Sequence, residues 1–160
     1  MTDVGIYAAL ETELTTALAG ISGVVAVTPT CDIEDLVYRI SPDGGGGRTP
    51  AIGVVEVASK RTTIPGSSGG GFYSIANRHI TTVSTWEIAV VVRNERGKSD
   101  ARSTVRTILE TIRDRVHYLS TTATTYRSKW TWVGEEKVKT AEDDLYAWVA
   151  TYSVDCFFGN

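Results

Sequence analysis

Apolar residues recur at helical spacing in three parts of the chain. Between Asp3 and Ala19 they return every three or four positions, and between Ser99 and Leu119 seven of them fall within an arc of about 100°. The shorter segment Thr30–Ile40 has acids near its start and an arginine near its end, the polarity that a helix dipole favours. We therefore predict three helices, the longest of them capped by Ser99.

Other stretches are rich in β-branched and aromatic residues, which favour strands. The apolar end of the longest stretch is expected to be a central strand, buried on both faces. The predicted strands are Val24–Val27, Ala51–Ser59, Ile80–Arg93, Lys129–Val138 and Leu145–Phe157. Their order among the helices predicts an α+β fold, a single-domain sandwich of a mostly antiparallel or mixed β-sheet with helices packed on one face.

Composition supports one domain over residues 1–160. That length suits a single core, and 42% hydrophobic with 22% charged residues is typical of a globular chain. Many of the 15 glycines gather in segments 41–50 and 62–79, which we expect to be flexible loops. We expect neither secretion nor membrane insertion, because no signal-peptide pattern or apolar run of ~20 residues occurs. Cys31 and Cys156 are expected to be buried thiols.

Charge is segregated along the chain although its net value is only −3. The segment up to Ser59 holds eight acids and two bases, Lys60–Lys129 holds twelve bases and five acids, and the remainder holds six acids and two bases. Within the basic segment, arginines form a stripe about 40° wide along the predicted helix. A solvated helix flank, a site for an acidic protein partner and a nucleic-acid contact all fit such a stripe.

The sequence offers motifs that resemble catalytic sites, but none is complete. Gly97-Lys98-Ser99 follows a strand as a phosphate-binding loop would, yet Val92 stands where that loop needs its first glycine. Gly66–Gly70 matches the nucleophile-elbow pattern without the strand and helix that hold such a serine. His79 and His117 are too far apart for a zinc pair, and the cysteines lack zinc-site spacing. We predict no enzymatic activity, no cofactor and no metal.

Two other sets of residues look more structural than catalytic. Glu135 and Glu136 are neighbours in a strand and should point to opposite faces, so they would not converge on a substrate or cation. The four tryptophans lie mainly on predicted strands, which favours core packing or a subunit interface. They are Trp86, Trp130, Trp132 and Trp148.

The order of these elements resembles that of the tail-terminator, or tail-completion, proteins of tailed bacteriophages, in particular those of Mu-like contractile-tailed phages. The similarity covers most of the chain. It is carried by the N-terminal helix with Ile6–Leu10, the strand Trp86–Arg93, the helix Ser99–Leu119 and the closing aromatic strand that ends at Phe157-Phe158.

The resemblance implies a non-enzymatic virion protein of the tail and neck, assembled in the cytoplasm of the host bacterium. Proteins of this family are small α+β subunits that form a hexameric ring on the tail tube, end its polymerisation and present a surface to the head. The implied partners are further copies of the chain, the tail tube protein, the sheath protein and the head-side connector or neck protein, with DNA contact confined to the lumen. Alternatives are another neck or head–tail joining protein, or a small nucleotide- or nucleic-acid-binding domain.

A ring needs head-to-tail contacts between copies, and segregated charge suits such contacts. We expect the basic middle of one subunit to meet an acidic end of the next. The candidate interface residues are Arg93, Arg96, Lys98, Arg102, Arg106, Arg113, Glu142, Asp143 and Asp144.

Overall fold

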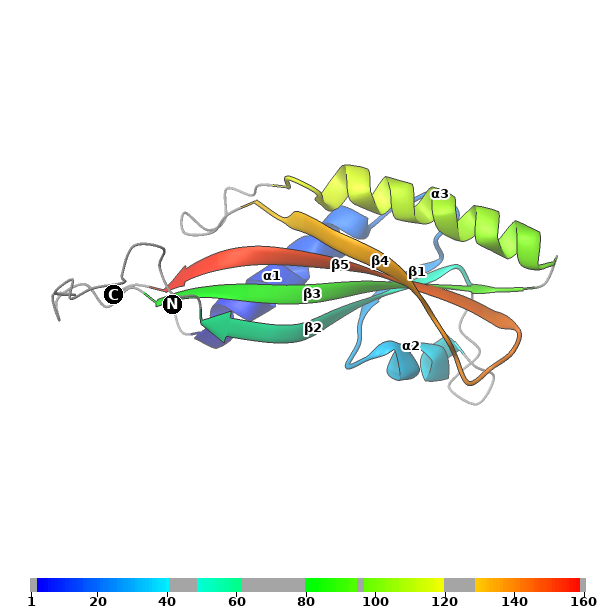
Figure 1. The fold of residues 1–160 in the computed structure, drawn as a ribbon, viewed down its shortest axis with the longest axis horizontal. Helices are drawn as coiled ribbons and strands as arrows, with labels where there is room; N and C mark the ends of the chain where they lie inside the picture. Colours follow the sequence, from blue (N-terminus) through cyan, green and yellow to red (C-terminus); the bar gives the residue numbers. More distant parts are fainter. Residues whose placement is uncertain (1–2, 41–48, 62–79, 95–96, 120–128, 159–160) are drawn as a thin grey trace, which may run out of the picture.

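A five-stranded mixed sheet forms the centre of the molecule, with helices on both of its faces (Figure 1). The computed structural model describes residues 3–40, 49–61, 80–94, 97–119 and 129–158. The elements in chain order are α1 (Asp3–Leu18), β1 (Ala26–Pro29), α2 (Ile33–Ile40), β2 (Ala51–Arg61), β3 (Ile80–Arg93), α3 (Lys98–Val116), β4 (Thr131–Val138) and β5 (Leu145–Phe158). The predicted α+β class and the mixed sheet are confirmed. The predicted loop residues 41–48 and 62–79 lie outside the described residues.

The strands lie in the order β1-β2-β3-β5-β4. β1 is parallel to β2, whereas β2, β3, β5 and β4 run antiparallel to their neighbours. β3 pairs with β5 along its whole length, from Ile80 opposite Phe158 to Arg93 opposite Leu145. Its segment Ile88–Val91 is buried on both faces, as expected of a central strand in an apolar run.

The larger core lies on the face covered by α1 and α3. Leu14 of α1 and Ile112 of α3 are fully buried there against Trp86, Ile88 and Tyr152 of the sheet. Trp86 also packs edge-on against Trp130, with ring centroids 6.3 Å apart. Trp148 packs against the same core from a partly buried position, so three of the four tryptophans serve the core, as the strand pattern predicts.

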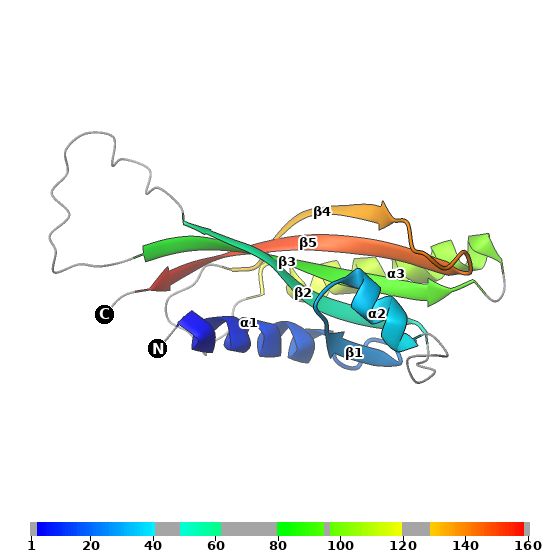
Figure 2. The same cartoon turned by 90° about the horizontal axis from the view of Figure 1, so that it is seen from below.

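α2 packs on the opposite face, so the expectation that the helices share one face is wrong for this helix. Leu36 and Ile40 of α2 are buried against Ala89, Val91 and Ala147, and α2 lies toward one end of the sheet (Figure 2). The reason is that β1, α2 and β2 form a parallel βαβ unit, in which the crossover hand decides the face that the helix covers. The apolar stripe of α2 shows which side of the helix is buried, and the β1–β2 pairing decides which face receives it.

α2 and β2 approach each other closely at Gly53. A Cβ at this position would lie 2.9 Å from Oγ1 of Thr30, closer than real Cβ atoms approach, and 3.0 Å from Cδ2 of Leu36, tighter than most real Cβ contacts. The absence of a side chain at Gly53 therefore permits this approach.

The residue that caps the start of α3 lies earlier in the chain than the sequence suggests. Gly97, with φ 107°, is the N-cap residue, and its carbonyl accepts the amides of Asp100 and Ala101. The prediction that Ser99 caps the helix is wrong, because the positive φ of Gly97 places Ser99 inside the first turn, and no side chain caps this helix. At the other end the helix stops at Val116, and Tyr118 adopts a left-handed φ of 63°.

Two further expectations concern cysteines and membranes. Cys156 is buried as predicted, but Cys31 is exposed just before α2, and neither forms a disulfide within the described part of the chain. None of the helices in the described part of the chain is long and apolar enough to span a bilayer.

Candidate subunit interface

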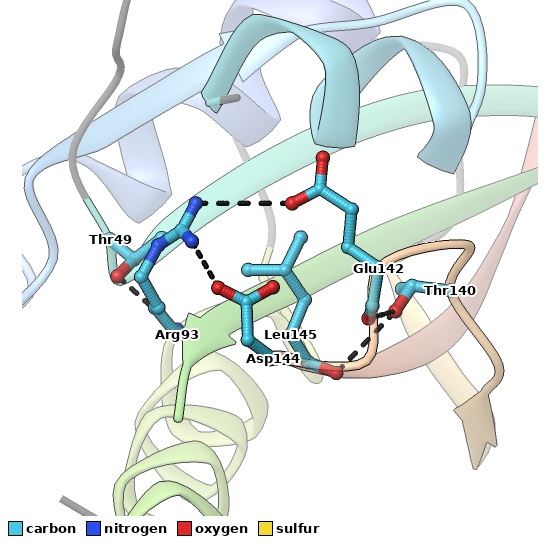
Figure 3. Close-up of polar contacts among 6 residues, drawn as sticks. All are labelled: Thr49, Arg93, Thr140, Glu142, Asp144 and Leu145. Atoms are coloured by element: carbon cyan, nitrogen blue, oxygen red, sulfur yellow. Dashed lines mark hydrogen bonds and ion pairs between the residues drawn. The ribbon is translucent and has the colours of Figure 1, made fainter. Parts of the chain in front are cut away.

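The turn between β4 and β5 is bound to the end of β3 by ion pairs (Figure 3). Arg93, the last residue of β3, forms an ion pair with Asp144 and lies 4.0 Å from the carboxylate of Glu142. The backbone amide of Asn94 donates to the carbonyl of Asp144, and Oγ1 of Thr140 donates to the carbonyl of Glu142. Three of the residues predicted to meet another subunit therefore pair within this chain.

Asp143 differs from its two acidic neighbours. It is exposed, and it makes no ion pair with any residue that the structure describes. Since the guanidinium of Arg93 offsets part of the charge of Glu142 and Asp144, this turn offers a partner less negative charge than its sequence suggests. Arg96 lies outside the described residues.

The arginine stripe of α3 also divides into two parts. Lys98, Arg102 and Arg106 are exposed, and within the described ranges they have no acidic partner. Arg113, two turns further on, bends over β4: its guanidinium lies 2.6 Å from Oε1 of Glu135 and 4.7 Å from the ring centroid of Trp132. Arg113 therefore fastens α3 to the sheet, whereas Arg102 and Arg106 remain available to a partner.

The chain after α3 covers the beginning of strand β4. The amide of Tyr118 donates to the carbonyl of Trp130, 2.7 Å away, and the amide of Trp130 donates to the carbonyl of Leu119. The amide of Trp132 donates to Nδ1 of His117, 3.1 Å away. The first residues of this outer strand are thus paired, and its free edge begins after Trp132.

Each side of the sheet ends in a strand segment without a pairing partner in the described structure. On one side this is the β4 edge, residues 133–138, which pairs only with β5. On the other side the sheet ends at β1, whose outer side pairs with no described strand. Because β1 covers β2 only from Ala51 to Val54, residues 55–61, the β2 edge, pair with β3 alone. Unpaired strand edges present rows of backbone donors and acceptors to any strand that approaches.

The β4 edge and the β2 edge each contain a β-bulge with an exposed valine. On the β2 edge the bulge lies between Glu56 and Ala58, and on β4 it lies between Trp132 and Gly134. The extra residues are Val57, 49% exposed, and Val133, 58% exposed. Sequence reasoning missed both: a bulge shifts the alternation of faces by one residue, and the residues that follow each bulge are mostly polar or small, so the shift leaves little apolar pattern to read.

Two carboxylates, those of Glu56 and Glu11, lie near each other on the α1 side of the β2 edge, whose far end carries the bases Lys60 and Arg61. Glu56 projects from the same face of the sheet as Trp86, toward α1, where Glu11 lies near it. Burial raises the pKa of Glu56, and the charge of Glu11 raises that pKa further. Two carboxylates that repel each other would gain from a cation placed between them.

Other charged residues act within the chain. Arg115 of α3 donates to the carbonyls of Ala17 and Ala19 at the end of α1, at 3.2 and 2.7 Å. This contact satisfies helix-end carbonyls and was not foreseen, since the partners are nearly a hundred residues apart. Glu135 and Glu136 point to opposite faces as predicted: Glu135 reaches Arg113, and Glu136 raises the pKa of Glu87 on the α2 side.

Among the described residues no group of three or more histidines, cysteines and carboxylates could hold a metal ion. The glycine-lysine-serine sequence at the start of α3 follows a strand in which Val92 is buried in the core. Val92 stands where a phosphate-binding loop needs its first glycine, and here it serves the core instead.

Comparison with known proteins finds similarity in fold. No protein-family model matches this sequence, and no curated protein matches it. A chain from the solved virion of a native gene transfer agent (GTA) particle is similar in structure, with a TM-score of 0.57 and 10% sequence identity. The match covers 93% of this chain and 95% of that chain, so the shared fold extends over nearly the whole of both.

Proposed function

We propose that this protein is a structural subunit of a tailed-phage-like virion, and specifically a tail terminator. Copies of the chain form a hexameric ring on the end of the tail tube, stop its polymerisation and offer the head or neck a surface for attachment. The observation that carries this proposal is the match to a gene transfer agent virion chain over nearly the full length of both chains. The resemblance of the element order to tail terminators supports the finer assignment.

The surface of the protein suits assembly. The β4 and β2 edges, the exposed valines at their bulges and the exposed Arg102 and Arg106 of α3, which make no ion pair with any described residue, are all features that a neighbouring subunit can use. In the virion the proposed partners are further copies of the chain, the tail tube protein, the sheath protein and the head-side connector. DNA would meet only the lumen of the ring.

Electron microscopy of the purified protein mixed with tail tubes tests the proposal. We expect a sixfold ring at one end of each tube, and tubes capped in this way should not lengthen when tube protein is added. A protein that ignores tubes, or decorates them along their length, contradicts the terminator role. Binding to isolated connectors but not to tubes would instead identify another neck or head–tail joining protein.

A control addresses the nucleotide-binding alternative. ATP or duplex DNA at moderate salt should show no saturable binding to the wild-type protein. Saturable ATP binding that is lost in Lys98→Ala would show that the start of α3 binds phosphates and would contradict a purely structural role.

A further inference from the structure

We infer that neighbouring copies associate by pairing the β4 edge of one copy with the β2 edge of the next, so that the two sheets continue into each other. This inference rests on the proposed ring in one respect, that copies of the chain meet head to tail. It adds which surfaces meet, and it assigns a role to two bulged edges that the fold itself does not use.

Strand direction favours this pairing. β2 and β5 run one way, and β3 and β4 run the other way. When a second copy lies beside the first in the same orientation, its β2 therefore runs antiparallel to β4. Antiparallel pairing satisfies the exposed backbone groups of both edges without a change in either fold.

The positions of the free segments determine how the copies are offset. The β4 edge lies toward the α2 end of the sheet, since Val138 shares a level with Ala147 and Val91. The β2 edge lies toward the other end, beyond Pro29. To overlap fully, the copies must shift along the strands by about five residues, or roughly 17 Å. A ring closed with such an offset has strands tilted to its axis, as in a barrel.

Apolar contacts reinforce the backbone pairing. With full overlap, both Val57 and Val133 lie inside the joint between the sheets. Trp132, 37% exposed, and Tyr118, 65% exposed, flank the same edge of β4. Large exposed apolar residues that border an unpaired strand are typical of a surface that a partner covers.

Charge favours a head-to-tail joint over a two-fold one. Continuing the sheet keeps α1 and α3 on the same face, so Arg102 and Arg106 of one copy approach the side of the next copy that carries Glu11 and Glu56. A two-fold axis that paired β4 with β4 would set the arginine flank of α3 against its own copy. Like charges in that arrangement repel, whereas the head-to-tail arrangement relieves the repulsion between the two carboxylates.

Mixing two variants tests the pairing. Val133→Asp places a charge on the β4 edge, and Val57→Asp places one on the β2 edge. Both side chains are about half exposed, so the fold should persist, and Val25→Asp, which alters a valine 54% exposed outside both edges, is the matched control. Sedimentation and native mass spectrometry at high protein concentration report the species formed.

Each edge variant alone should fail to associate, and an equimolar mixture should give one-to-one dimers and nothing larger. This follows because only the intact β2 edge of the first variant and the intact β4 edge of the second can meet. Self-association of Val57→Asp at the wild-type level would reveal a two-fold β4 contact and overturn the inference. The inference would also be overturned if Val25→Asp lost association as fully as the edge variants do, or if the wild-type chain stayed monomeric at its highest soluble concentration.

Charge reversal provides a second test that does not alter the edges. Arg102→Glu with Arg106→Glu should weaken association about tenfold or more and leave the circular dichroism spectrum unchanged. Adding Glu11→Lys and Glu56→Lys to the same chain should restore association. If association is not restored, the assigned contact is contradicted. If the variants still form rings that cap tubes as the wild type does, only this inference is contradicted. If copies join through their sheets but do not bind tubes, only the terminator role is contradicted.

Discussion

The two faces of the sheet are built from the same strands but are filled differently. On the α1 and α3 side, alternate residues of β3, from Trp86 to Val92, are buried beneath two helices. On the α2 side, Ala89 and Val91 are buried, but Thr85 and Glu87 lie beyond the short helix and remain partly exposed. Residues on the two faces of one strand therefore contribute very differently to the free energy of unfolding, and substitutions along β3 measure the difference.

The largest effect is expected at Ile88. This side chain is fully buried between the sheet and the helices, so Ile88→Ala should lower the free energy of unfolding by about 2–5 kcal/mol. Thr85→Ala, on the other face of the same strand, should change it by no more than about 0.5 kcal/mol. Urea unfolding followed by tryptophan fluorescence measures both, and equal losses would contradict the contrast between the faces.

The next effect concerns how closely α2 sits on its face. Gly53→Ala would place a methyl group against Thr30 and Leu36, and the displacement of α2 should cost about 1–3 kcal/mol. Gly134→Ala is the matched control, because nothing lies within 4 Å of a Cβ built there. If the two alanine variants unfold at the same urea concentration, α2 does not depend on the close approach at Gly53.

Features decided by residues close together in the chain could be predicted from the sequence, and features decided by distant residues could not. The apolar periodicity predicts α3 and its arginine stripe well, because a helix face is decided by residues near one another in the chain. The face covered by α2 depends on the β1–β2 pairing, and the partner of Arg93 is an aspartate 51 residues away. The bulges at Val57 and Val133 leave no clear pattern in the sequence, and they define the edges on which the proposed assembly depends.

A smaller effect is expected from the ion pair that joins α3 to the sheet. Arg113→Ala removes the contacts with Glu135 and Trp132, and it should destabilise the protein by about 0.5–1 kcal/mol, since Arg113 is partly solvated. Arg39→Ala, which breaks the exposed Asp35–Arg39 pair within α2, should cost less. A double-mutant cycle of Arg113→Ala with Glu135→Ala measures the coupling, and zero coupling would mean that Trp132 alone holds the arginine.

The smallest effect has the opposite sign and depends on pH. Burial raises the pKa of Glu87 above its ordinary value of 4.5, and the nearby Glu136 raises that pKa further. The folded state thus binds the proton more tightly than the unfolded state, so wild-type stability falls as pH rises from about that value through the raised pKa.

Glu87→Gln removes this pH-dependent loss. The variant should match the wild type below pH 4.5 and should exceed it at neutral pH by no more than about 0.5 kcal/mol, because water screens the half-buried carboxylate. Glu136→Gln should give part of the same gain by removing the repelling charge. Urea midpoints measured across this pH range decide the matter: a Glu87→Gln variant that is less stable than the wild type at neutral pH would show that Glu87 contributes a favourable contact on the partly exposed face.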